Sequence, residues 1–492
     1  MNLHHPLLLL LLASAACTPP VDEPEPADSA APVDDDVPAD TDADDSDAAT
    51  TDPTLPLLGE AFDCGTATSV GGLADGNDAV ALTQHAIDTT RFPDALCNDG
   101  STAVFYYRPA SNAAAANKWV IELMGGGGCQ TGEGCAKRWC SVDTNFSKTQ
   151  MTSTTSPPDT NGNGILARSS DQPIPAPNPI ETYNQVLIKY CSSDTWRGTQ
   201  RDLAVDAAHP VTGVPVSYRI HFLGRRILEA TLDTLRRDGV ATLTYDTTEM
   251  ADLDAATEVI LAGASAGGGG TTYNLDWMRD RLRATNPGVP LYGLIDSTFG
   301  PDLLGLDYSS STYCTEMNLC SDAAFLGYGY DVQANTWGAE DETSCAAAHP
   351  TDIWKCASDT HVVLNHLTTP FFVRQGLSDG LISDAYVDAG LRKNGVAYTL
   401  QQFGLDVRTQ LLALPDLVTS AEEGASIATA AGAYGPVCSK HETLRSTADT
   451  FEVTITPSGG TATRMFDVWN AWRAGTGTTA LATQTAADTF CP

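Results

Sequence analysis

The fold class can be predicted from Glu258-Val-Ile-Leu-Ala-Gly-Ala-Ser265-Ala-Gly-Gly-Gly-Gly270. An apolar run, a glycine-rich turn and then an amphipathic segment predict a strand, a sharp turn and a helix. Gly263 and Gly267 would let the main chain take the strained turn that presents a serine at the edge of a sheet. The pattern therefore predicts a nucleophile elbow with Ser265 as the catalytic nucleophile.

A second stretch of the same pattern, Gly376-Leu-Ser378-Asp379-Gly380, competes with the first. In an elbow, the residue after the serine gives its backbone N–H to the oxyanion that develops during the reaction. Asp379 at that position would set a carboxylate against this negative charge, whereas Ala266 carries no charge. Ser265 is therefore favoured over Ser378.

A nucleophilic serine needs a histidine base, and in hydrolases of this type the histidine comes last along the chain. Of the nine histidines, only His441 lies beyond the last strand that the sequence predicts, at residues 370–374. His441 follows Cys438 closely, and a disulfide at that cysteine could fix its loop. In isolation, a surface histidine beside Lys440 is the simpler interpretation, so the chain order is what favours catalysis.

The acid of the triad should lie between the serine and the histidine along the chain. Asp379 follows the predicted strand 370–374 by a few residues, at the carboxyl edge where open α/β sheets place their active sites. Three other aspartates remain open as alternatives at this stage: Asp384, Asp388 and Asp302.

A glycine-rich loop after an earlier apolar run supplies the rest of a predicted oxyanion hole. Residues 119–124 lead into Gly125-Gly126-Gly127-Gly128-Cys129, where main chain can approach a substrate without obstruction by side chains. We expect the N–H groups of Gly126 and Gly127 to act together with that of Ala266. A phosphate-binding loop is the competing interpretation, but no Gly-Lys-Ser/Thr sequence follows the glycines.

Short apolar runs alternate with amphipathic stretches over the rest of the chain, which predicts an α/β fold with a mostly parallel sheet flanked by helices, as in α/β hydrolases. The helical spacing of apolar residues predicts a helix over residues 218–238. We treat residues 310–366, with four cysteines, as a disulfide-rich insertion. The predicted buried strands are residues 119–123, 185–190, 258–262, 291–295 and 370–374.

The N-terminal part of the chain predicts export. Residues 1–17 have a short apolar core and small residues before Cys17, as in a bacterial lipoprotein signal, with Cys17 as the lipidated residue. Ordinary secretion, with cleavage at Ala13-Ser-Ala15, is the alternative. Residues 18–58 are rich in Pro, Ala and Asp and predict a disordered acidic tether. The hydrolase domain is expected over residues 59–492.

The cysteine count fits an oxidising compartment. The chain has 13 Cys, and lipidation of Cys17 would leave an even dozen for six disulfides. No CxxC pair and no HExxH motif is present, so we expect no metal. The pairing cannot be deduced from the sequence, but four short or convenient bridges are the easiest: Cys129–Cys135, Cys314–Cys320, Cys345–Cys356 and Cys438–Cys491.

Charge excludes nucleic acid as the main partner. The formal net charge is -35, with 62 Asp plus Glu against 27 Lys plus Arg, and phosphate binding needs clustered cations. Asp159, Asn161 and Asn163 match the opening of a calcium loop. Position twelve of that loop would be Ser170 in place of the bidentate Glu that such loops use, which argues against calcium.

These stretches together resemble the pectin acetylesterase and Notum family of serine carboxylesterases over about residues 63–491. The resemblance is carried by the Gly125–Cys129 loop, Gly162-Asn-Gly-Ile-Leu, Tyr190-Cys-Ser-Ser-Asp-Thr-Trp-Arg-Gly198, the Ser265 elbow, Asp296-Ser297, the strand ending at Asp379 and Cys438-Ser-Lys-His441-Glu. The family places aromatic residues just before the loop cysteine, whereas this chain has Gly127-Gly128. That difference puts the family's acyl preference in doubt here.

The resemblance implies the same triad, Ser265, Asp379 and His441, and an oxyanion hole made by Gly126, Gly127 and Ala266. It also makes Asp194 and Trp196 pocket candidates, with a supporting role beneath the pocket as the alternative.

The activity implied is that of an exported serine esterase without metal or organic cofactor. Its substrate would be an ester, and O-acetyl groups of an extracellular polysaccharide are the first expectation. The protein would contact a membrane only through the lipid anchor. Deacylation of longer chains, as in Notum, is the enzymatic alternative. A glycan-binding lipoprotein on a hydrolase scaffold is the alternative from another class.

Overall fold

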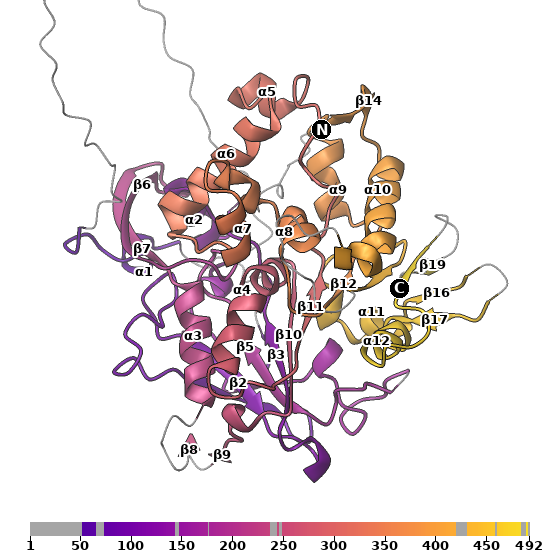
Figure 1. Cartoon of the computed structure of the whole chain (residues 1–492). Helices are drawn as coiled ribbons and strands as arrows, with labels where there is room; N and C mark the ends of the chain where they lie inside the picture. Colours follow the sequence, from indigo (N-terminus) through magenta and orange to yellow (C-terminus); the bar gives the residue numbers. More distant parts are fainter. Residues whose placement is uncertain are drawn as a thin grey trace, which may run out of the picture.

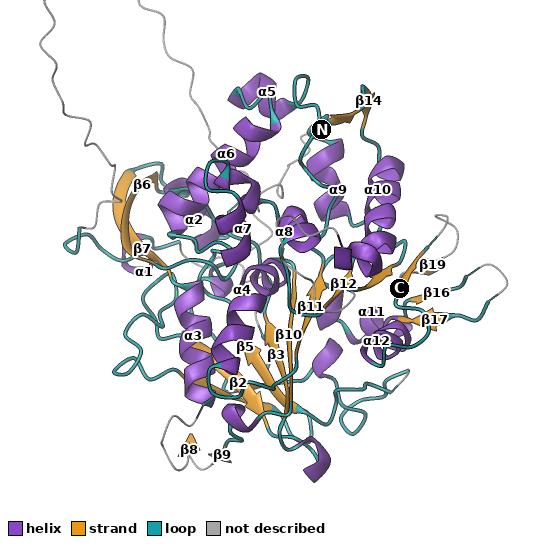
Figure 2. Ribbon diagram, viewed as in Figure 1, coloured by secondary structure: helices purple, strands orange, loops and turns teal. Residues whose placement is uncertain are grey.

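A ten-stranded sheet runs through the centre of the computed structural model, with helices on both of its sides (Figure 1, Figure 2). The structure describes residues 52–64, 73–142, 147–175, 177–236, 244–245, 248–419, 431–457, 460–483 and 489–490. In spatial order the strands are β18 (Ala480–Ala482), β15 (Gly432–Gly435), β12 (Phe371–Arg374), β11 (Leu291–Asp296), β10 (Glu258–Ala264), β3 (Lys118–Leu123), β5 (Asn184–Ile188), β2 (Val104–Arg108), β1 (Leu82–Ala86) and β4 (Asp159–Thr160). Neighbours from β18 to β5 are parallel, and β2, β1 and β4 extend the sheet antiparallel.

All five predicted strands are present, as β3, β5, β10, β11 and β12, with boundaries within about two residues of those expected. Strands β10 and β12 are buried at every position. Such strands read as continuous apolar runs because helices cover both faces of a parallel sheet. The predicted fold class, a mostly parallel sheet flanked by helices, is confirmed.

Two pairs of helices cover the sheet. Helices α3 (Gly224–Leu235) and α4 (Ala266–Arg283) lie on one side in Figure 2, and α11 (Thr447–Glu452) and α12 (Met465–Arg473) lie on the other. The remaining helices outside the insertion are α1 (Leu58–Ala61), α2 (Gly132–Trp139), α9 (Gly380–Val387) and α10 (Leu400–Ala413). The α4 helix follows β10 directly, so the strand, turn and helix of the elbow are adjacent in space as well as in sequence.

The helix predicted over residues 218–238 begins too early. Its first residues belong to strand β7 (Pro215–Phe222), which pairs antiparallel with β6 (Gln200–Ala208), and helix α3 starts only at Gly224. Apolar and polar side chains alternate from Tyr218 to Phe222, which is typical of a strand. Pairing with β6 also provides hydrogen bonds for the backbone of this segment, and the two effects outweigh the helical spacing. The last residues of the predicted helix, from 237 on, lie outside the described residues.

The segment treated as an insertion connects the neighbouring strands β11 and β12 and is helical. It contains α5 (Thr312–Met317), α6 (Asp322–Val332), a π-helical turn (Gln333–Trp337), α7 (Thr343–Ala348), a 3-10 turn (Ile353–Ala357) and α8 (Asp359–Asn365). These elements gather at the end of the sheet to which β11 leads (Figure 1). The insertion therefore lies at the carboxyl edge of the parallel strands.

Five disulfides join described cysteines, and three of them are among the predicted pairs. Those three are Cys129–Cys135, Cys314–Cys320 and Cys345–Cys356. The other two, Cys64–Cys140 and Cys97–Cys191, join residues far apart in the sequence, which no local rule predicts. Cys438 is also disulfide-bonded, and Cys491, its predicted partner, lies outside the described residues.

Short strand pairs complete the description: β8 (Thr244–Tyr245) with β9 (Thr248–Glu249), β13 (Arg392–Lys393) with β14 (Val396–Ala397), and β16 (Thr454–Ile455) with β17 (Thr463–Arg464) and β19 (Thr489–Phe490). The predicted signal, Cys17 and nearly all of the predicted tether lie outside the described residues. Among the helices of the described ranges, none is both long and apolar enough to cross a membrane.

Candidate active site

The turn between β10 and α4 holds Ser265 in a left-handed backbone conformation, with φ 56° and ψ -125°. A non-glycine residue with positive φ is strained and persists only where the surrounding structure enforces it. Here the surroundings are backbone: a Cβ on Gly263 would clash with the carbonyl of Gly267, and one on Gly267 with the carbonyl of Leu123. The glycines flanking Ser265 are therefore required by the close approach of α4 to β10 and β3.

The side-chain oxygen of Ser265 is buried, and no described residue hydrogen-bonds to it. The same holds for Nε2 of His441. The backbone N–H of Ser265 donates to the carbonyl of Asp296 on β11 at 2.9 Å, which ties the elbow to the neighbouring strand. No hydrogen bond joins these two atoms in this structure, so the Ser265–His441 contact that proton transfer needs would form on closer approach of the two side chains.

Asp379 and His441 are hydrogen-bonded to each other. Nδ1 of His441 lies 3.0 Å from Oδ2 and 3.2 Å from Oδ1 of Asp379, whose side chain is fully buried. Because a carboxylate can only accept, this contact places the proton of the imidazole on Nδ1 and leaves Nε2 as the acceptor.

The Asp379 carboxylate is itself held in place. Asp379 is the N-cap of α9, and its Oδ1 accepts from the backbone N–H groups of Leu381 at 3.1 Å and Ile382 at 3.4 Å. Nε2 of Gln375 donates to Oδ2 at 3.2 Å. Helix N-caps favour Asp because its side chain satisfies N–H groups of the first turn. The capping role therefore fixes the orientation of the carboxylate towards His441.

The surroundings raise the pKa of His441 above its usual value of 6.5. Burial acts to lower this pKa, but the charge of the Asp379 carboxylate and its hydrogen bond outweigh burial, and Glu442 and Asp296 add to the rise. An imidazole whose pKa is raised is a stronger proton acceptor. This is the shift that a general base requires, since the charged form is stabilised by the partner carboxylate.

The loop that carries His441 is anchored by the end of β11, a role that the sequence did not indicate. Oδ2 of Asp296 accepts from Oγ1 of Thr443 and from the backbone N–H of Leu444, both at 3.0 Å. Oγ of Ser297 accepts from the backbone N–H of Glu442 at 3.2 Å. Asp296 and Ser297 therefore position the histidine loop. Their succession directly after a buried strand was the available signal, but their targets lie about 145 residues away.

The glycine loop after β3 is held through its carbonyl groups. Nη2 of Arg138 donates to the carbonyl of Gly126 at 2.6 Å, and the hydroxyl of Tyr190 donates to the carbonyl of Gly127 at 2.7 Å. In a trans peptide the N–H of the next residue points away from the carbonyl. Arg138 thus fixes the direction of the N–H of Gly127. Gly126 and Gly127 have φ of 142° and 62°, a conformation that glycine adopts easily.

The two pocket candidates lie beneath the site. Asp194 is fully buried. Its carboxylate accepts from Oγ of Ser192 at 2.7 Å and, at 2.6 Å, from the backbone N–H of Gly224, which is the first residue of α3. Burial raises the pKa of Asp194 to about 6, although these hydrogen bonds oppose the rise. Trp196 is fully buried, and its Nε1 donates to the carbonyl of Met124 at 3.1 Å.

Among the described residues, the alternative serine does not have the backbone of an elbow, and the alternative aspartates do not pair with His441. Ser378 is not among the residues with positive φ in the described ranges. Asp384 and Asp388 are exposed on and just after α9, and Oδ1 of Asp302 accepts from the backbone N–H of Leu304 at 3.0 Å. Asp379 is thus the aspartate hydrogen-bonded to Nδ1 of His441.

The residues of the calcium-like stretch bind backbone groups of the preceding loop. Oδ1 of Asp159 accepts from the N–H of Gly76 at 2.7 Å, and Oδ1 of Asn161 accepts from the N–H groups of Asn77 at 2.6 Å and Asp78 at 3.0 Å. These oxygens close a loop against the edge of the sheet at β4.

A cavity of about 70 Å³ lies beside the elbow, at the carboxyl edge of the sheet. The methyl groups of Thr195 and Thr298, which line it, lie against the glycines of the first turn of α4. The other walls come from the insertion and from α9, whose N-cap is Asp379. Lining residues from these parts include Trp337, Asp359, Thr360, Ile382 and Ala385.

The fold and this arrangement define an α/β-hydrolase-type protein with the parts of a serine hydrolase site: an elbow serine, a histidine paired with a buried carboxylate, and a glycine loop. The chain belongs to the pectinacetylesterase family, whose model matches residues 76–474.

Two relatives of the Notum type are similar to this chain. The palmitoleoyl-protein carboxylesterase NOTUM of Drosophila melanogaster is 30% identical over 285 residues, which cover 58% of this chain and 36% of that protein. Palmitoleoyl-protein carboxylesterase notum1 of Xenopus laevis is 27% identical over 353 residues, 71% of this chain and 60% of that protein. The chain thus spans between about a third and three fifths of the length of these relatives.

A crystal structure of the Wnt deacylase Notum from Drosophila has the same fold. It superposes with a TM-score of 0.57 and 24% sequence identity, covering 84% of this chain and all of that one.

Proposed function

We propose that this chain is a serine esterase that hydrolyses carboxylic esters through an acyl-enzyme, with Ser265, His441 and Asp379 as its catalytic triad. The observation that carries the proposal is the buried hydrogen bond between His441 and Asp379 at the edge of the sheet where the strained Ser265 turn lies. Membership of the pectinacetylesterase family supports an ester as the bond that is cleaved.

In the first half of the reaction, Nε2 of His441 accepts the proton of Ser265 Oγ as this oxygen attacks the ester carbonyl carbon. The Asp379 carboxylate stabilises the imidazolium that forms. The N–H groups of Ala266, Gly126 and Gly127 donate to the oxyanion of the tetrahedral intermediate. The imidazolium then protonates the leaving alcohol, and the acyl group stays on Ser265.

In the second half, His441 removes a proton from a water molecule, whose oxygen attacks the acyl carbon. The bond from this carbon to Ser265 Oγ then breaks, His441 returns the proton to Oγ, and the carboxylic acid leaves. No step needs a metal or an organic cofactor. Asp296 and Ser297 position His441 by their hydrogen bonds to its loop. Arg138 positions the N–H of Gly127 by its hydrogen bond to the glycine loop.

For the acyl part we propose a short group, acetyl first, because the family that the chain belongs to is named for an acetylesterase. The residues that line the cavity beside α4 do not include Ser265, His441 or the glycine loop, so its volume does not set the acyl length.

Trp337 fills part of the space beside the glycine loop. Its ring lies 3.4 Å from where a Cβ on Gly128 would be, and its Nε1 donates to the carbonyl of Cys129 at 2.8 Å. Although Gly127-Gly128 takes the place of the family's aromatic residues, an aromatic wall is supplied by the insertion. The insertion thus places an aromatic side chain next to the glycine loop, as the family does by other residues.

For the alcohol part we propose an O-acetylated extracellular polysaccharide that is neutral or heavily acetylated. A chain with a formal net charge of -35 repels an exposed polyanion such as de-esterified pectin. Disulfides between described cysteines support export to an oxidising compartment. Anchoring of the exported chain through Cys17 is part of this proposal.

The proposal is tested with the wild-type chain, S265A and S378A on p-nitrophenyl esters of two and ten carbons. We expect S265A to lower kcat/KM by about 10⁵-fold or more, and S378A to change it by less than about threefold. The acetyl ester should be preferred by at least tenfold. Release of acetate from acetylated xylan should exceed release from acetylated pectin.

Three results would contradict the proposal. Full activity of S265A would remove the nucleophile, and a preference for the ten-carbon ester would favour the Notum-like alternative. Binding of acetylated glycans in a pull-down, without hydrolysis of any ester by a folded sample, would favour a binding protein on a hydrolase scaffold.

A further inference from the structure

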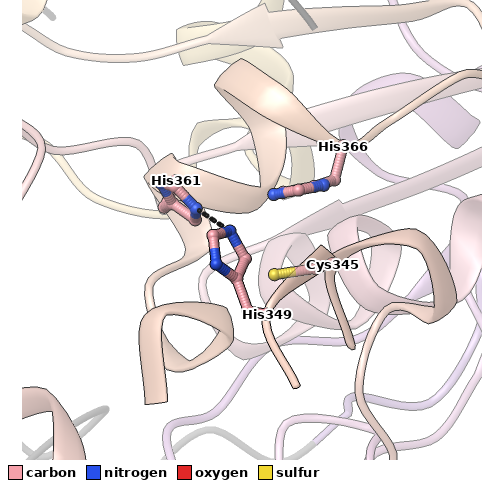
Figure 3. Close-up of side chains that lie close together, drawn as sticks. All are labelled: Cys345, His349, His361 and His366. Atoms are coloured by element: carbon pink, nitrogen blue, oxygen red, sulfur yellow. Dashed lines mark hydrogen bonds between the residues drawn. The ribbon is translucent and has the colours of Figure 1, made fainter. Parts of the chain in front are cut away.

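Three histidines and a cysteine of the insertion converge in the interior, away from the triad. Cys345 lies in α7, His349 directly follows that helix, His361 lies in α8, and His366 follows α8. Their possible ligand atoms all lie within 4.8 Å of one another, and all four residues are buried. Figure 3 shows the three imidazole rings facing a common centre.

The spacing of the rings is that of metal ligands. Nε2 of His349 and Nε2 of His361 are 3.2 Å apart, and the centroids of the three rings are 5.2 to 5.4 Å from one another. Zinc–nitrogen bonds of about 2.0–2.1 Å in tetrahedral geometry set two ligand nitrogens about 3.3 Å apart. Two nitrogens already lie at this separation, and the ligand atom of His366 lies within 4.8 Å of them.

A carboxylate lies behind one of the rings, since Nδ1 of His349 is 3.2 Å from Oδ1 of Asp352. Metal-bound histidines commonly donate their other ring N–H to such an oxygen, which orients the ring. Nδ1 of His361 instead accepts from Nδ2 of Asn365 at 3.1 Å, and the same Nδ2 donates to the backbone carbonyl of His361 at 3.0 Å. Binding of a metal through Nε2 of His361 therefore requires the ring proton to move to Nδ1 and the Asn365 amide to turn.

Cys345 is joined to Cys356 by a disulfide, so its sulfur is not a thiolate ligand in this structure. The protein-derived ligands are then the three imidazoles, with the fourth position left for water. Imidazole suits Zn²⁺, Cu²⁺ and Ni²⁺, and a tetrahedral set of three nitrogens and one oxygen suits Zn²⁺. We propose that His349, His361 and His366 form a Zn²⁺ site.

The site would brace the wall of the cavity beside the elbow. Ser358, Asp359 and Thr360 at the start of α8 line that cavity, whereas His361 belongs to the histidine cluster. The hydroxyl of Tyr273 on α4 donates to the carbonyl of Cys356 at 2.9 Å, which joins this region to the elbow helix. A metal that ties α7 to α8 therefore stabilises the fold without touching Ser265, and the proposal does not depend on the esterase function.

The test uses the full chain with its disulfides intact, stripped of metal with a chelator and titrated with ZnCl₂ in a calorimeter. We expect one Zn²⁺ per chain, and a rise in Tm of about 3–5 °C at a free zinc concentration one hundred times the Kd. X-ray absorption at the zinc edge should show nitrogen ligands at about 2.0–2.1 Å. The S265A variant should bind zinc as tightly as the wild type.

Two variants test the ligands, H361Q and H366N, because either one alone may fail to fold. Each should weaken zinc binding at least about 100-fold in a sample whose circular dichroism matches the wild type, whereas H209A, outside the cluster, should leave it unchanged. Absence of zinc binding by the folded wild type would overturn the proposal. So would zinc binding that is unchanged in a folded H361Q or H366N sample, or that appears only after the Cys345–Cys356 disulfide is reduced.

Discussion

Replacing Asp379 by Asn tests the pairing that supports the triad. The substitution keeps the size of the side chain and the capping of α9, where Asp379 accepts from the backbone N–H groups of Leu381 and Ile382. It removes the negative charge 3.0 Å from Nδ1 of His441. The imidazolium of the transition state then has no carboxylate to stabilise it, and the preferred tautomer of the imidazole is lost.

The size of the effect follows from this distance. Two unit charges 3.0 Å apart, in surroundings with an effective dielectric constant of about 20, attract each other by about 5 kcal/mol. At about 1.4 kcal/mol for each factor of ten, the loss corresponds to about 10⁴-fold in kcat. The pKa of His441 should also fall, because the Asp379 charge and hydrogen bond raise it.

The assay is hydrolysis of p-nitrophenyl acetate over a range of pH, with D384N as the matched control. Asp384 is exposed on the helix that Asp379 caps, so D384N makes the same chemical change nearby. We expect D379N to lose about 10⁴-fold in kcat and D384N to stay within about threefold. A loss of less than tenfold in a folded D379N protein would refute the assignment of Asp379 as the acid.

Three further predictions concern pH, packing and crosslinking. The wild-type kcat/KM should rise with pH with an apparent pKa above 6.5, because only neutral His441 can accept the serine proton and its pKa is raised; an acid limb well below 6.5 would count against it. Gly267→Ala should lower the free energy of unfolding in urea by about 3 kcal/mol, because the new Cβ would clash with the carbonyl at the end of β3. In the control Gly288→Ala the new Cβ has no atom within 4 Å, so the free energy of unfolding should change by less than about 0.5 kcal/mol. Changing Cys97 and Cys191 to Ser together should lower stability by about 4 kcal/mol in the same assay, since their disulfide closes a loop of 94 residues; a loss below about 1 kcal/mol would contradict this estimate.

The sheet was predictable where its strands are buried on both faces. Residues 259–262 and 291–295 are continuous apolar runs, and burial on both faces makes such strands visible in the sequence. The hairpin of β6 and β7 was missed because its second strand runs directly into α3, so a single apolar period seemed to cover both. The boundary between β7 and α3 is set by Asp194, which lies in a distant loop and accepts a hydrogen bond from the first N–H of α3.

At the candidate site, residues with a local motif could be found and those with a distant target could not. Ser265 lies within glycines that its turn requires, and chain order singled out His441. The hydrogen bond of Asp296 to the His441 loop joins residues 148 apart and leaves no periodic trace in the sequence. Such partners become visible only when the sheet brings separate loops to one edge.

The histidine cluster was overlooked for a related reason. CxxC and HExxH spacings place metal ligands on one short element, and the sequence has neither. His361 lies in α8, whereas His349 and His366 follow α7 and α8, and the fold brings His349 and His361 to 3.2 Å of each other. The concentration of three of nine histidines within 18 residues was the signal available in the sequence.

The most direct test of the central claim, that Ser265 is an activated nucleophile, is labelling with a fluorophosphonate probe followed by mass spectrometry of the modified peptide. The sample is the folded chain with its disulfides formed, and the D379N variant is labelled in parallel. The account predicts a single modified residue, Ser265, with much slower labelling in D379N. Labelling at Ser378, or no labelling of a folded wild-type sample, would contradict it.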